Sequence, residues 1–216
     1  ALQQQLKKGD FEPVGYEVRF TTELENQQMH LSYGARGVMS LNGKIDRMDL
    51  CEEDDKVYLK IIDYKSGRTK FDLASVFHGL QLQLMVYMNA AREEQQQKKK
   101  QCIVIPAGIL YYHIDDPVLE SDTPLSDEEA EQALLFALRP DGLVNSGEEI
   151  YRAMDQNFEG KSQMIPVEIK KNGEISTARS KVASTEAFAV ITRYVEHEIR
   201  QCGEAIYAGN IAVNPY

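Results

Sequence analysis

The sequence predicts an α/β fold in which a small mixed sheet is flanked by helices. Segments of alternating apolar and polar residues predict strands, and longer segments with apolar residues at helical spacing predict helices. The predicted strands lie near residues 14–20, 38–50, 57–65 and 103–114. A chain of 216 residues, 43% of them hydrophobic, is long enough to bury one substantial core. We therefore expect a single domain over residues 1–216.

The third of these strands is the clearest. Val57, Leu59 and Ile61 share one face because side chains alternate along a strand with a period of two. Asp63 and Lys65 continue the same face. An apolar face that ends in a carboxylate and an ammonium group is unusual, and it marks this strand end as a candidate site.

The other elements follow from local signals. Asn42-Gly43 interrupts the second strand and suggests a turn or a bulge. Asp72 is a plausible N-cap for a helix that carries Gln83 and Tyr87 on one side and ends in the polar run 95–100. A final long helix is expected after Ser184. It should pack back on the core, which we place at about 11–114 and 184–210.

The stretch between these parts is acidic and contains helix signals. Ser126 and Glu129 form a capping box at the start of a helix, and Arg139-Pro140-Asp141-Gly142 ends it. We expect residues 115–183 to be a mostly helical insertion.

Charge and composition exclude several classes of protein. Lys and Arg number 24 and Asp and Glu 34, so the net charge of −10 argues against nucleic-acid binding by a broad basic surface. It does not exclude an enzyme that meets phosphates through a metal ion, because the ion reverses the local field. No apolar run approaches the ~20 residues of a membrane span. No secretory signal is present, and Cys51, Cys102 and Cys202 lack paired spacing, which predicts a cytoplasmic protein with no membrane partner.

Three residues at the ends of adjacent predicted strands could carry chemistry. Asp46 and Asp63 could together chelate Mg²⁺, which prefers oxygen ligands. Lys65 could then orient a water molecule or stabilise charge that develops on a phosphate. An isolated Asp-x-Lys is more often a surface ion pair, so the surrounding motifs decide between the two interpretations.

Those motifs are Gly43-Lys44-Ile45-Asp46-Arg47, then Ile61-Ile62-Asp63-Tyr64-Lys65-Ser66-Gly67, then Gln83-Leu84-Met85-Val86-Tyr87. In this order they resemble the RecB-like branch of the PD-(D/E)xK nucleases. The resemblance is closer to the C-terminal nuclease domain of the B subunits of AddAB-type ATP-dependent helicase–nucleases, and it covers most of the chain. It implies a restriction-endonuclease-like core and a Mg²⁺- or Mn²⁺-dependent DNA exonuclease. Such a nuclease cuts the strand that runs 5′ to 3′ from a DNA end, in an enzyme that processes double-strand breaks for recombinational repair.

The resemblance also implies roles for individual residues. Asp46 and Asp63 would ligate the metal, Tyr64 would add its backbone carbonyl, and Lys65 would be the catalytic lysine. Supporting positions near the metal or the DNA would be held by Gln83, Tyr87, Arg47 and Ser66. Gln83 and Tyr87 lie one turn apart and could equally be a pair that packs a helix on the sheet.

The resemblance also implies partners, and cofactor ligands that lie outside residues 1–216. The resemblance implies DNA ends and single-stranded DNA as substrates and a heterodimer with a helicase–nuclease A subunit. A metal-binding histidine would lie upstream of Ala1. Four cysteines for a 4Fe–4S cluster would lie outside residues 1–216, since Cys51, Cys102 and Cys202 match none of them. We therefore expect the cluster only in a full-length protein and weak activity from this fragment alone.

Two other functions share some of these features. A non-catalytic, nuclease-like module could guide single-stranded DNA or brace a partner protein, but it would have no need of Asp46, Asp63 and Lys65 together. A stand-alone Cas4-like nuclease shares the motifs. The long acidic segment after Ile114 favours the helicase–nuclease over that alternative.

Overall fold

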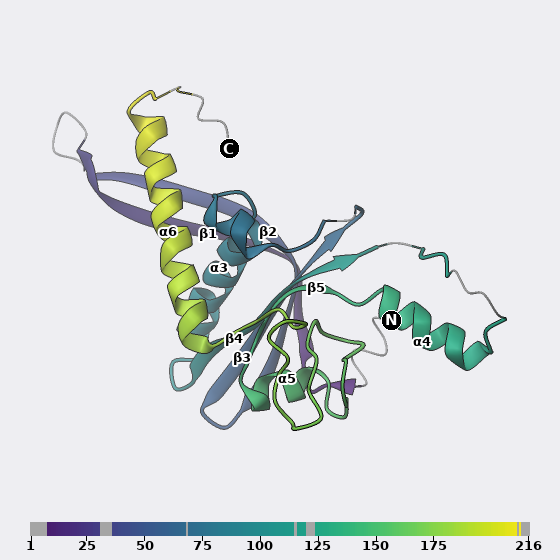
Figure 1. Cartoon of the computed structure of the whole chain (residues 1–216). Coiled ribbons are helices and arrows are strands. Elements are labelled where there is room, and N and C mark those ends of the chain that lie inside the picture. Colours follow the sequence, from purple (N-terminus) through teal and green to yellow (C-terminus); the bar gives the residue numbers. More distant parts are fainter. Residues whose placement is uncertain are drawn as a thin grey trace.

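The computed structural model describes residues 8–30, 36–67, 69–114, 116–119, 124–210 and 212. Its centre is a six-stranded mixed sheet in the order β1-β2-β3-β4-β5-β6 (Figure 1). The strands are β1 (Glu12–His30), β2 (Arg36–Glu53), β3 (Lys56–Lys65), β4 (Ile103–His113), β5 (Asp141–Asn145) and β6 (Val182–Ala183). β3 pairs in parallel with β4 and β5 with β6, and the other pairings are antiparallel. The four strands predicted from the sequence are confirmed.

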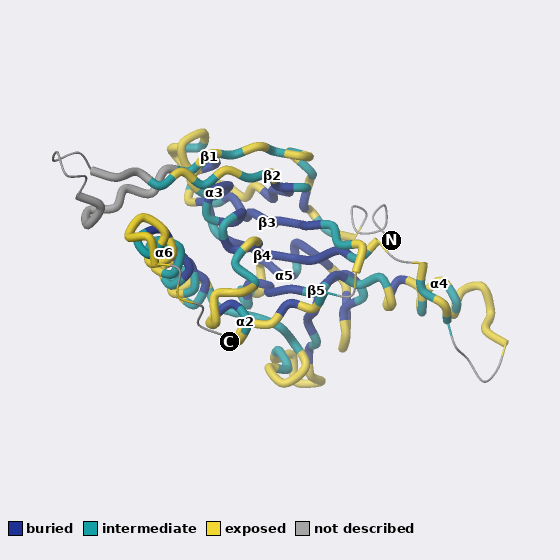
Figure 2. Tube along the Cα trace, turned by 90° about the horizontal axis from the view of Figure 1, so that it is seen from above, coloured by how far each residue is buried: buried dark blue, intermediate teal, exposed yellow. Residues whose placement is uncertain are grey.

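Helices and loops cover both faces of this sheet. The helices of the described residues are α2 (Leu73–Phe77), α3 (Gln83–Lys98), α4 (Asp127–Ala137), α5 (Glu148–Met154) and α6 (Thr185–Tyr207). α3 and α6 pack on one face, where Leu84, Met88 and Phe188 join a core with Leu59 and Ile61 of β3. α5 and the loops that follow it, up to β6, pack on the other. Figure 2 shows the central strands buried between these layers and α4 exposed at the side.

The helix predicted after Asp72 is in fact two helices. Asp72 does cap α2, because its carboxylate accepts hydrogen bonds from Ala74 N at 3.2 Å and Ser75 N at 3.0 Å. Gly79 then adopts a left-handed φ of +74°, which a helix cannot continue through, and the chain turns before α3 begins. The break makes Gln83 the first residue of α3.

The turn or bulge predicted at Asn42-Gly43 is wrong. β2 runs through this point without interruption, with Asn42 opposite Thr21 and Gly43 opposite Phe20. The glycine has a packing role instead. A Cβ atom at residue 43 would lie 2.5 Å from the Phe20 ring and 3.3 Å from Tyr87. Because there is no side chain, Phe20 and Tyr87 can meet edge to face with their centroids 5.7 Å apart.

The segment 115–183 contributes to the central sheet as well as carrying helices. The capping box of α4 is confirmed, since Ser126 and Glu129 bond reciprocally. The expectation of a mostly helical insertion missed β5, which pairs with β4, and β6 beside it. A Cβ atom at Gly142 would lie 2.0 Å from Ile109 O, so only glycine lets β5 approach β4 this closely. The Pro140-Asp141-Gly142 sequence therefore begins a strand rather than a loop.

The long C-terminal helix forms as predicted. Ser184 caps α6 by accepting a hydrogen bond from Ala187 N, and Gly209 follows its end with a φ of +68°. Phe188 and Val195 are buried, whereas Ile206 is 78% exposed, so only the first part of α6 packs firmly on the sheet. None of the helices in the described ranges combines the length and the apolar character that crossing a bilayer requires.

Candidate active site

Two neighbouring strands bring the predicted acidic residues together. Asp46 lies on β2, and Asp63 and Lys65 lie at the carboxyl end of β3, on the sheet face that α3 covers. The carboxylate of Asp46 accepts a hydrogen bond from Tyr64 N at 2.9 Å, so it reaches the end of β3 directly. The sheet therefore brings both carboxylates and the lysine together at the carboxyl end of β3.

Asp63 is buried with an incompletely satisfied carboxylate. It is 3% exposed, and its Oδ2 atom has no hydrogen-bond partner among the described residues. The ammonium of Lys65 lies 2.6 Å from that oxygen and supplies opposite charge to it. Burial raises the pKa of Asp63, the ammonium of Lys65 opposes this, and the Asp46 carboxylate adds to the rise. The ionised form of this buried carboxylate therefore depends on a nearby cation.

Helix α3 holds the ammonium of Lys65 in place. Lys65 Nζ donates to Gln83 Oε1 at 3.0 Å, and Gln83 Nε2 donates to the Tyr87 hydroxyl at 2.7 Å. Tyr87 is itself buried against Phe20. The structure thus connects Gln83 and Tyr87 to the site as one hydrogen-bonded chain. The two uses that the sequence left open, packing and site support, are combined in this pair.

Tyr111 belongs to the site but was not identified from the sequence. It lies beside Asp63 in the parallel pairing of β3 with β4, and the ammonium of Lys65 lies 5.4 Å from the centre of its ring. Burial and the Asp63 carboxylate raise the pKa of Tyr111 to about 12, so its phenol stays protonated at neutral pH. The register of β3 against β4 would have revealed it, and that register is not encoded in any local motif.

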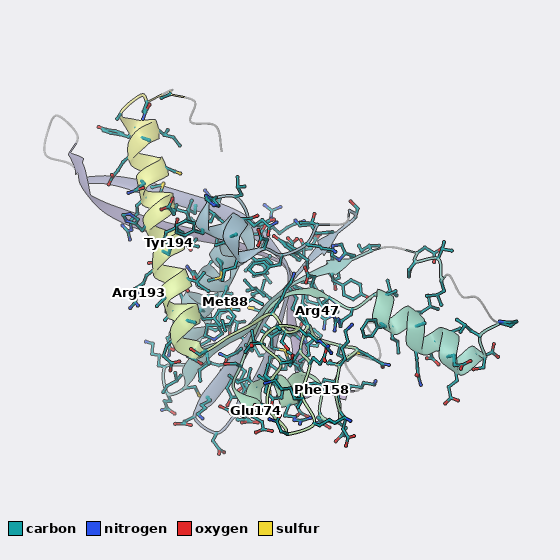
Figure 3. All side chains as sticks on the ribbon, viewed as in Figure 1. Arg47, Met88, Phe158, Glu174, Arg193 and Tyr194 are labelled. Atoms are coloured by element: carbon teal, nitrogen blue, oxygen red, sulfur yellow. The ribbon has the colours of Figure 1, made fainter. Side chains whose placement is uncertain are left out.

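Two predicted supporting residues lie apart from the carboxylates. Arg47 is buried on the opposite face of the sheet, where Nε and Nη2 donate to the two Asp49 oxygens at 2.6 and 2.8 Å. Figure 3 shows Arg47 on the side of Phe158 and Met88 on the side of α3. Ser66 follows β3 and is exposed. Because its side chain lies on the opposite face of the sheet, Arg47 can affect Asp46 only through the backbone of β2.

Tyr64 reaches the site through its backbone. Its ring packs edge to face with Tyr112, with centroids 5.8 Å apart, while its amide bonds to Asp46. The side chain of the intervening residue in Asp63-Tyr64-Lys65 thus points to the other face, as strand alternation requires. The predicted metal contact of its carbonyl stays a prediction.

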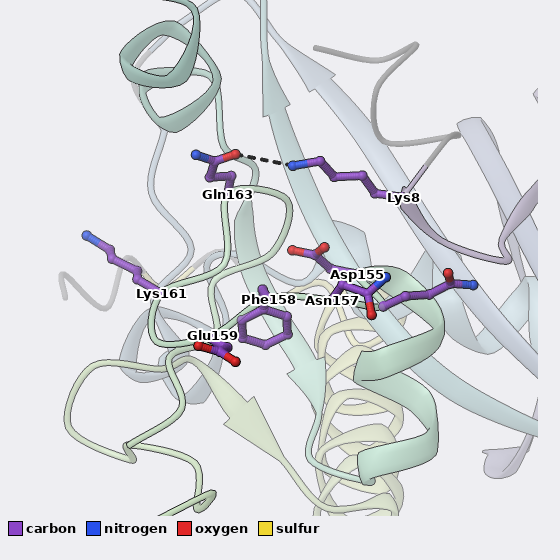
Figure 4. Close-up of a pocket in the computed structure, with 8 residues that line it drawn as sticks. Lys8, Asp155, Asn157, Phe158, Glu159, Lys161 and Gln163 are labelled. Atoms are coloured by element: carbon purple, nitrogen blue, oxygen red, sulfur yellow. Dashed lines mark hydrogen bonds between the residues drawn. The ribbon is translucent and has the colours of Figure 1, made fainter. Parts of the chain in front are cut away.

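A pocket of about 400 Å³ lies elsewhere, beside the end of α5. Figure 4 shows its lining, which includes Lys8, Phe158 and Lys161, with Lys8 Nζ bonded to Gln163 at 3.3 Å. None of Asp46, Asp63 and Lys65 lines it. It is not part of the candidate active site.

The donor atoms of the site suit a hard divalent cation. The carboxylates of Asp46 and Asp63 are oxygen ligands, and one buried oxygen lacks a hydrogen bond. Across the part of the chain that the structure describes, no cluster of three or more His, Cys, Asp or Glu side chains is found that could hold a metal. Mg²⁺ is commonly held by one or two carboxylates and several waters, so the pair fits it better than Zn²⁺, which prefers nitrogen and sulfur.

Known proteins resemble the chain along its whole length. The family model of the PD-(D/E)XK nuclease superfamily matches residues 1–216. Proteins named as the B subunit of an ATP-dependent helicase/deoxyribonuclease are similar in Clostridium botulinum strain Hall (37% identity over 213 residues, 99% of the chain and 18% of the relative) and Acetivibrio thermocellus (35% over 215 residues, 100% and 19%). The same holds in Thermoanaerobacter sp. strain X514, with 38% identity over 220 residues, 100% of the chain and 18% of the relative. The chain thus spans about a fifth of the length of these relatives. Because the family model matches residues 1–216, the chain belongs to the PD-(D/E)XK nuclease superfamily.

Proposed function

We propose that the chain is the Mg²⁺-dependent DNA exonuclease domain of a helicase–nuclease that processes double-strand breaks for recombinational repair. The observation that carries the proposal is the meeting of Asp46, Asp63 and Lys65 at the carboxyl end of β3, with an Asp63 oxygen that lacks a hydrogen bond. A purely structural pair of strands has no need to bury a carboxylate in this way, because burial disfavours its ionised form.

The chemistry divides between the residues. Asp46 and Asp63 would hold the divalent ion, with Tyr64 adding its carbonyl, and the ion would supply Lewis acidity and lower the pKa of a bound water. Lys65, held by Gln83, would direct its positive charge at the scissile phosphate or at the attacking water. The protonated Tyr111 phenol would add no charge beside Asp63 and Lys65.

The remaining parts of the proposal rest on the names of the relatives and on the family resemblance of the sequence motifs. Each is named as the B subunit of a helicase/deoxyribonuclease, which supports a partner A subunit and a DNA substrate for this chain too. We propose cleavage of the strand that runs 5′ to 3′ from the end, single-stranded DNA as the bound form, and a cytoplasmic location. We further propose a 4Fe–4S cluster held by cysteines other than Cys51, Cys102 and Cys202, which are all free.

Variants of Asp46 and Lys65 should separate metal binding from catalysis. Asp46→Ala removes a ligand, so cleavage should require at least about tenfold more Mg²⁺ and recover in part when Mg²⁺ is raised. Lys65→Ala keeps both carboxylates, so its rate should fall about a hundredfold or more at every Mg²⁺ concentration. The measurement is the rate of release of end-labelled nucleotides by the full-length protein with its partner, as a function of Mg²⁺.

Lys44→Ala is the matched control for both variants. Lys44 lies on the same strand as Asp46 and forms an exposed ion pair with Glu17, so its loss should leave the Mg²⁺ dependence unchanged. If Lys65→Ala were rescued by Mg²⁺ while Asp46→Ala was not, the assigned roles would be wrong. If both variants cleaved DNA at the full rate, the cut would be made elsewhere in the complex. That result would instead favour a non-catalytic module that guides single-stranded DNA or braces its partner.

A further inference from the structure

A second, larger pocket lies beside the candidate active site. It has a volume of about 760 Å³ and is formed where the ends of β4 and α4 meet the start of β5. The side chains that matter for its chemistry are Lys70, His113, Asp116, Phe136, Arg139, Asp141 and Lys181. We call this the basic pocket.

The register of the sheet places the basic pocket next to Lys65. In the parallel pairing of β3 and β4, His113 is the partner of Lys65, so the two side chains leave the same face of neighbouring strands. Asp141 pairs in turn with Tyr111, the neighbour of Asp63. The candidate active site and the basic pocket therefore lie next to each other, across the neighbouring ends of β3, β4 and β5.

The connection after β3 is fixed to the wall of the basic pocket. Asp141 accepts a hydrogen bond from Phe71 N at 2.7 Å, and Lys181 Nζ donates to Phe71 O at 2.7 Å. Lys181 also pairs with Asp141 at 2.7 Å. The imidazole of His113 contacts Thr69 O at 2.6 Å. These contacts hold Lys70, which lies between Thr69 and Phe71, at the rim of the pocket.

Two cationic groups in the basic pocket, Lys70 and Arg139, have no carboxylate at ion-pair distance within the described residues, whereas Lys181 is matched by Asp141. Burial lowers the pKa of the Arg139 guanidinium, and the carboxylates of Asp141 and Glu168 act on it from a longer distance. Arg139 is oriented by neutral groups, since Nη1 donates to Ser162 O at 3.1 Å and its guanidinium lies 4.9 Å from the centre of the Phe136 ring. In a chain of net charge −10, such preoriented positive charge beside a nuclease site favours a phosphate ligand.

We propose that the basic pocket binds the phosphodiester backbone of single-stranded DNA next to the phosphate that is cut, through Lys70 and Arg139. This inference rests on the proposed nuclease function and adds the path of the substrate strand to it. A guanidinium matches phosphate oxygens geometrically, and an ammonium adds a point charge. The pocket would fix which phosphate reaches Asp46, Asp63 and Lys65.

The test is the binding of a fluorescein-labelled oligothymidylate to the 216-residue chain, measured by anisotropy in EDTA so that no cleavage occurs. Lys70→Gln combined with Arg139→Gln should raise Kd by about tenfold or more and reduce the slope of log K against log salt by roughly one. Lys98→Gln combined with Lys100→Gln removes the same amount of charge at the C-terminal end of α3, away from the candidate active site. This control should change Kd less than about twofold.

The outcomes separate this proposal from the nuclease assignment. Asp63→Ala should bind the oligonucleotide in EDTA at least as tightly as the unaltered chain, because the change removes a negative charge beside the path and no phosphate contact. In cleavage assays the Lys70→Gln/Arg139→Gln variant should raise KM more than it lowers kcat. Equal weakening by the pocket and control variants, or no binding by the unaltered chain, would overturn the proposed path. Metal-dependent cleavage that persisted in that case would leave the nuclease assignment intact.

Discussion

Replacing Asp63 with alanine is expected to abolish metal-dependent cleavage, with a fall in rate of at least about a thousandfold. Asp63 is the buried carboxylate whose Oδ2 lacks a hydrogen bond, and the ammonium of Lys65 lies against it. The substitution removes a metal ligand and the counter-charge of Lys65 at the same time. The measurement is the release of labelled nucleotides from a DNA end by the full-length protein with its partner.

The fold should survive this change. Because burial raises the pKa of Asp63, its ionised form costs folding free energy, and a variant without it should melt at an equal or higher temperature in EDTA. Glu17→Ala is the matched control, since Glu17 is an exposed carboxylate on β1 that pairs with Lys44 at 2.9 Å. It should leave cleavage unchanged. Wild-type cleavage by a folded Asp63→Ala protein would rule out the assigned site.

The second large effect is on stability, and it comes from a buried charge cluster on the sheet face opposite the candidate active site. Asp49 is fully buried and pairs with two buried cations, with Arg47 Nε at 2.6 Å and Lys60 Nζ at 3.0 Å. Asp49→Ala leaves both without their counter-charge and should destabilise the fold by about 3–5 kcal/mol. Urea unfolding followed by circular dichroism measures the loss. Since Arg47 adjoins Asp46 on β2, the change should also weaken metal binding in the protein that stays folded.

Lys60 gives this prediction a pH dependence. Burial lowers the pKa of Lys60 even with Asp49 present, so between that value and the ordinary one the unfolded chain binds more protons than the folded chain. Stability therefore rises with pH across this window, and the cost of Asp49→Ala should shrink as the pH rises toward the ordinary pKa of lysine. Glu52→Ala, which breaks the exposed pair with Lys99, should cost less than about 1 kcal/mol throughout. An Asp49→Ala cost as small as that of Glu52→Ala would contradict this account.

Local patterns predicted the elements that carry the proposed metal ligands. The alternation along β3 placed Asp63 and Lys65 on the face of Leu59 and Ile61, and the structure confirms that face. The N-cap at Asp72 and the start of a helix after Ser184 were likewise readable, since a capping side chain bonds within its own first turn. Such features depend on residues close in the sequence.

Features that depend on distant partners could not be predicted in the same way. β5 has five residues and begins at Pro140-Asp141-Gly142, a typical turn sequence, and becomes a strand only because β4 offers it an edge. The Gly43 packing site needs Phe20 and Tyr87 from two other elements. The basic pocket likewise requires the β3–β4 and β4–β5 registers, which no motif specifies.

The central claim, that Asp46 and Asp63 form a divalent-metal site, is tested most directly by titrating Mn²⁺ into the chain and following the free ion by its electron paramagnetic resonance spectrum. The unaltered chain should bind Mn²⁺ in competition with Mg²⁺, and Lys65→Ala should bind it at least as well, because removing the ammonium frees the Asp63 oxygen. Asp46→Ala and Asp63→Ala should each lose at least about tenfold in affinity. Equal Mn²⁺ affinity in all four proteins would contradict the assignment of these carboxylates as the metal ligands.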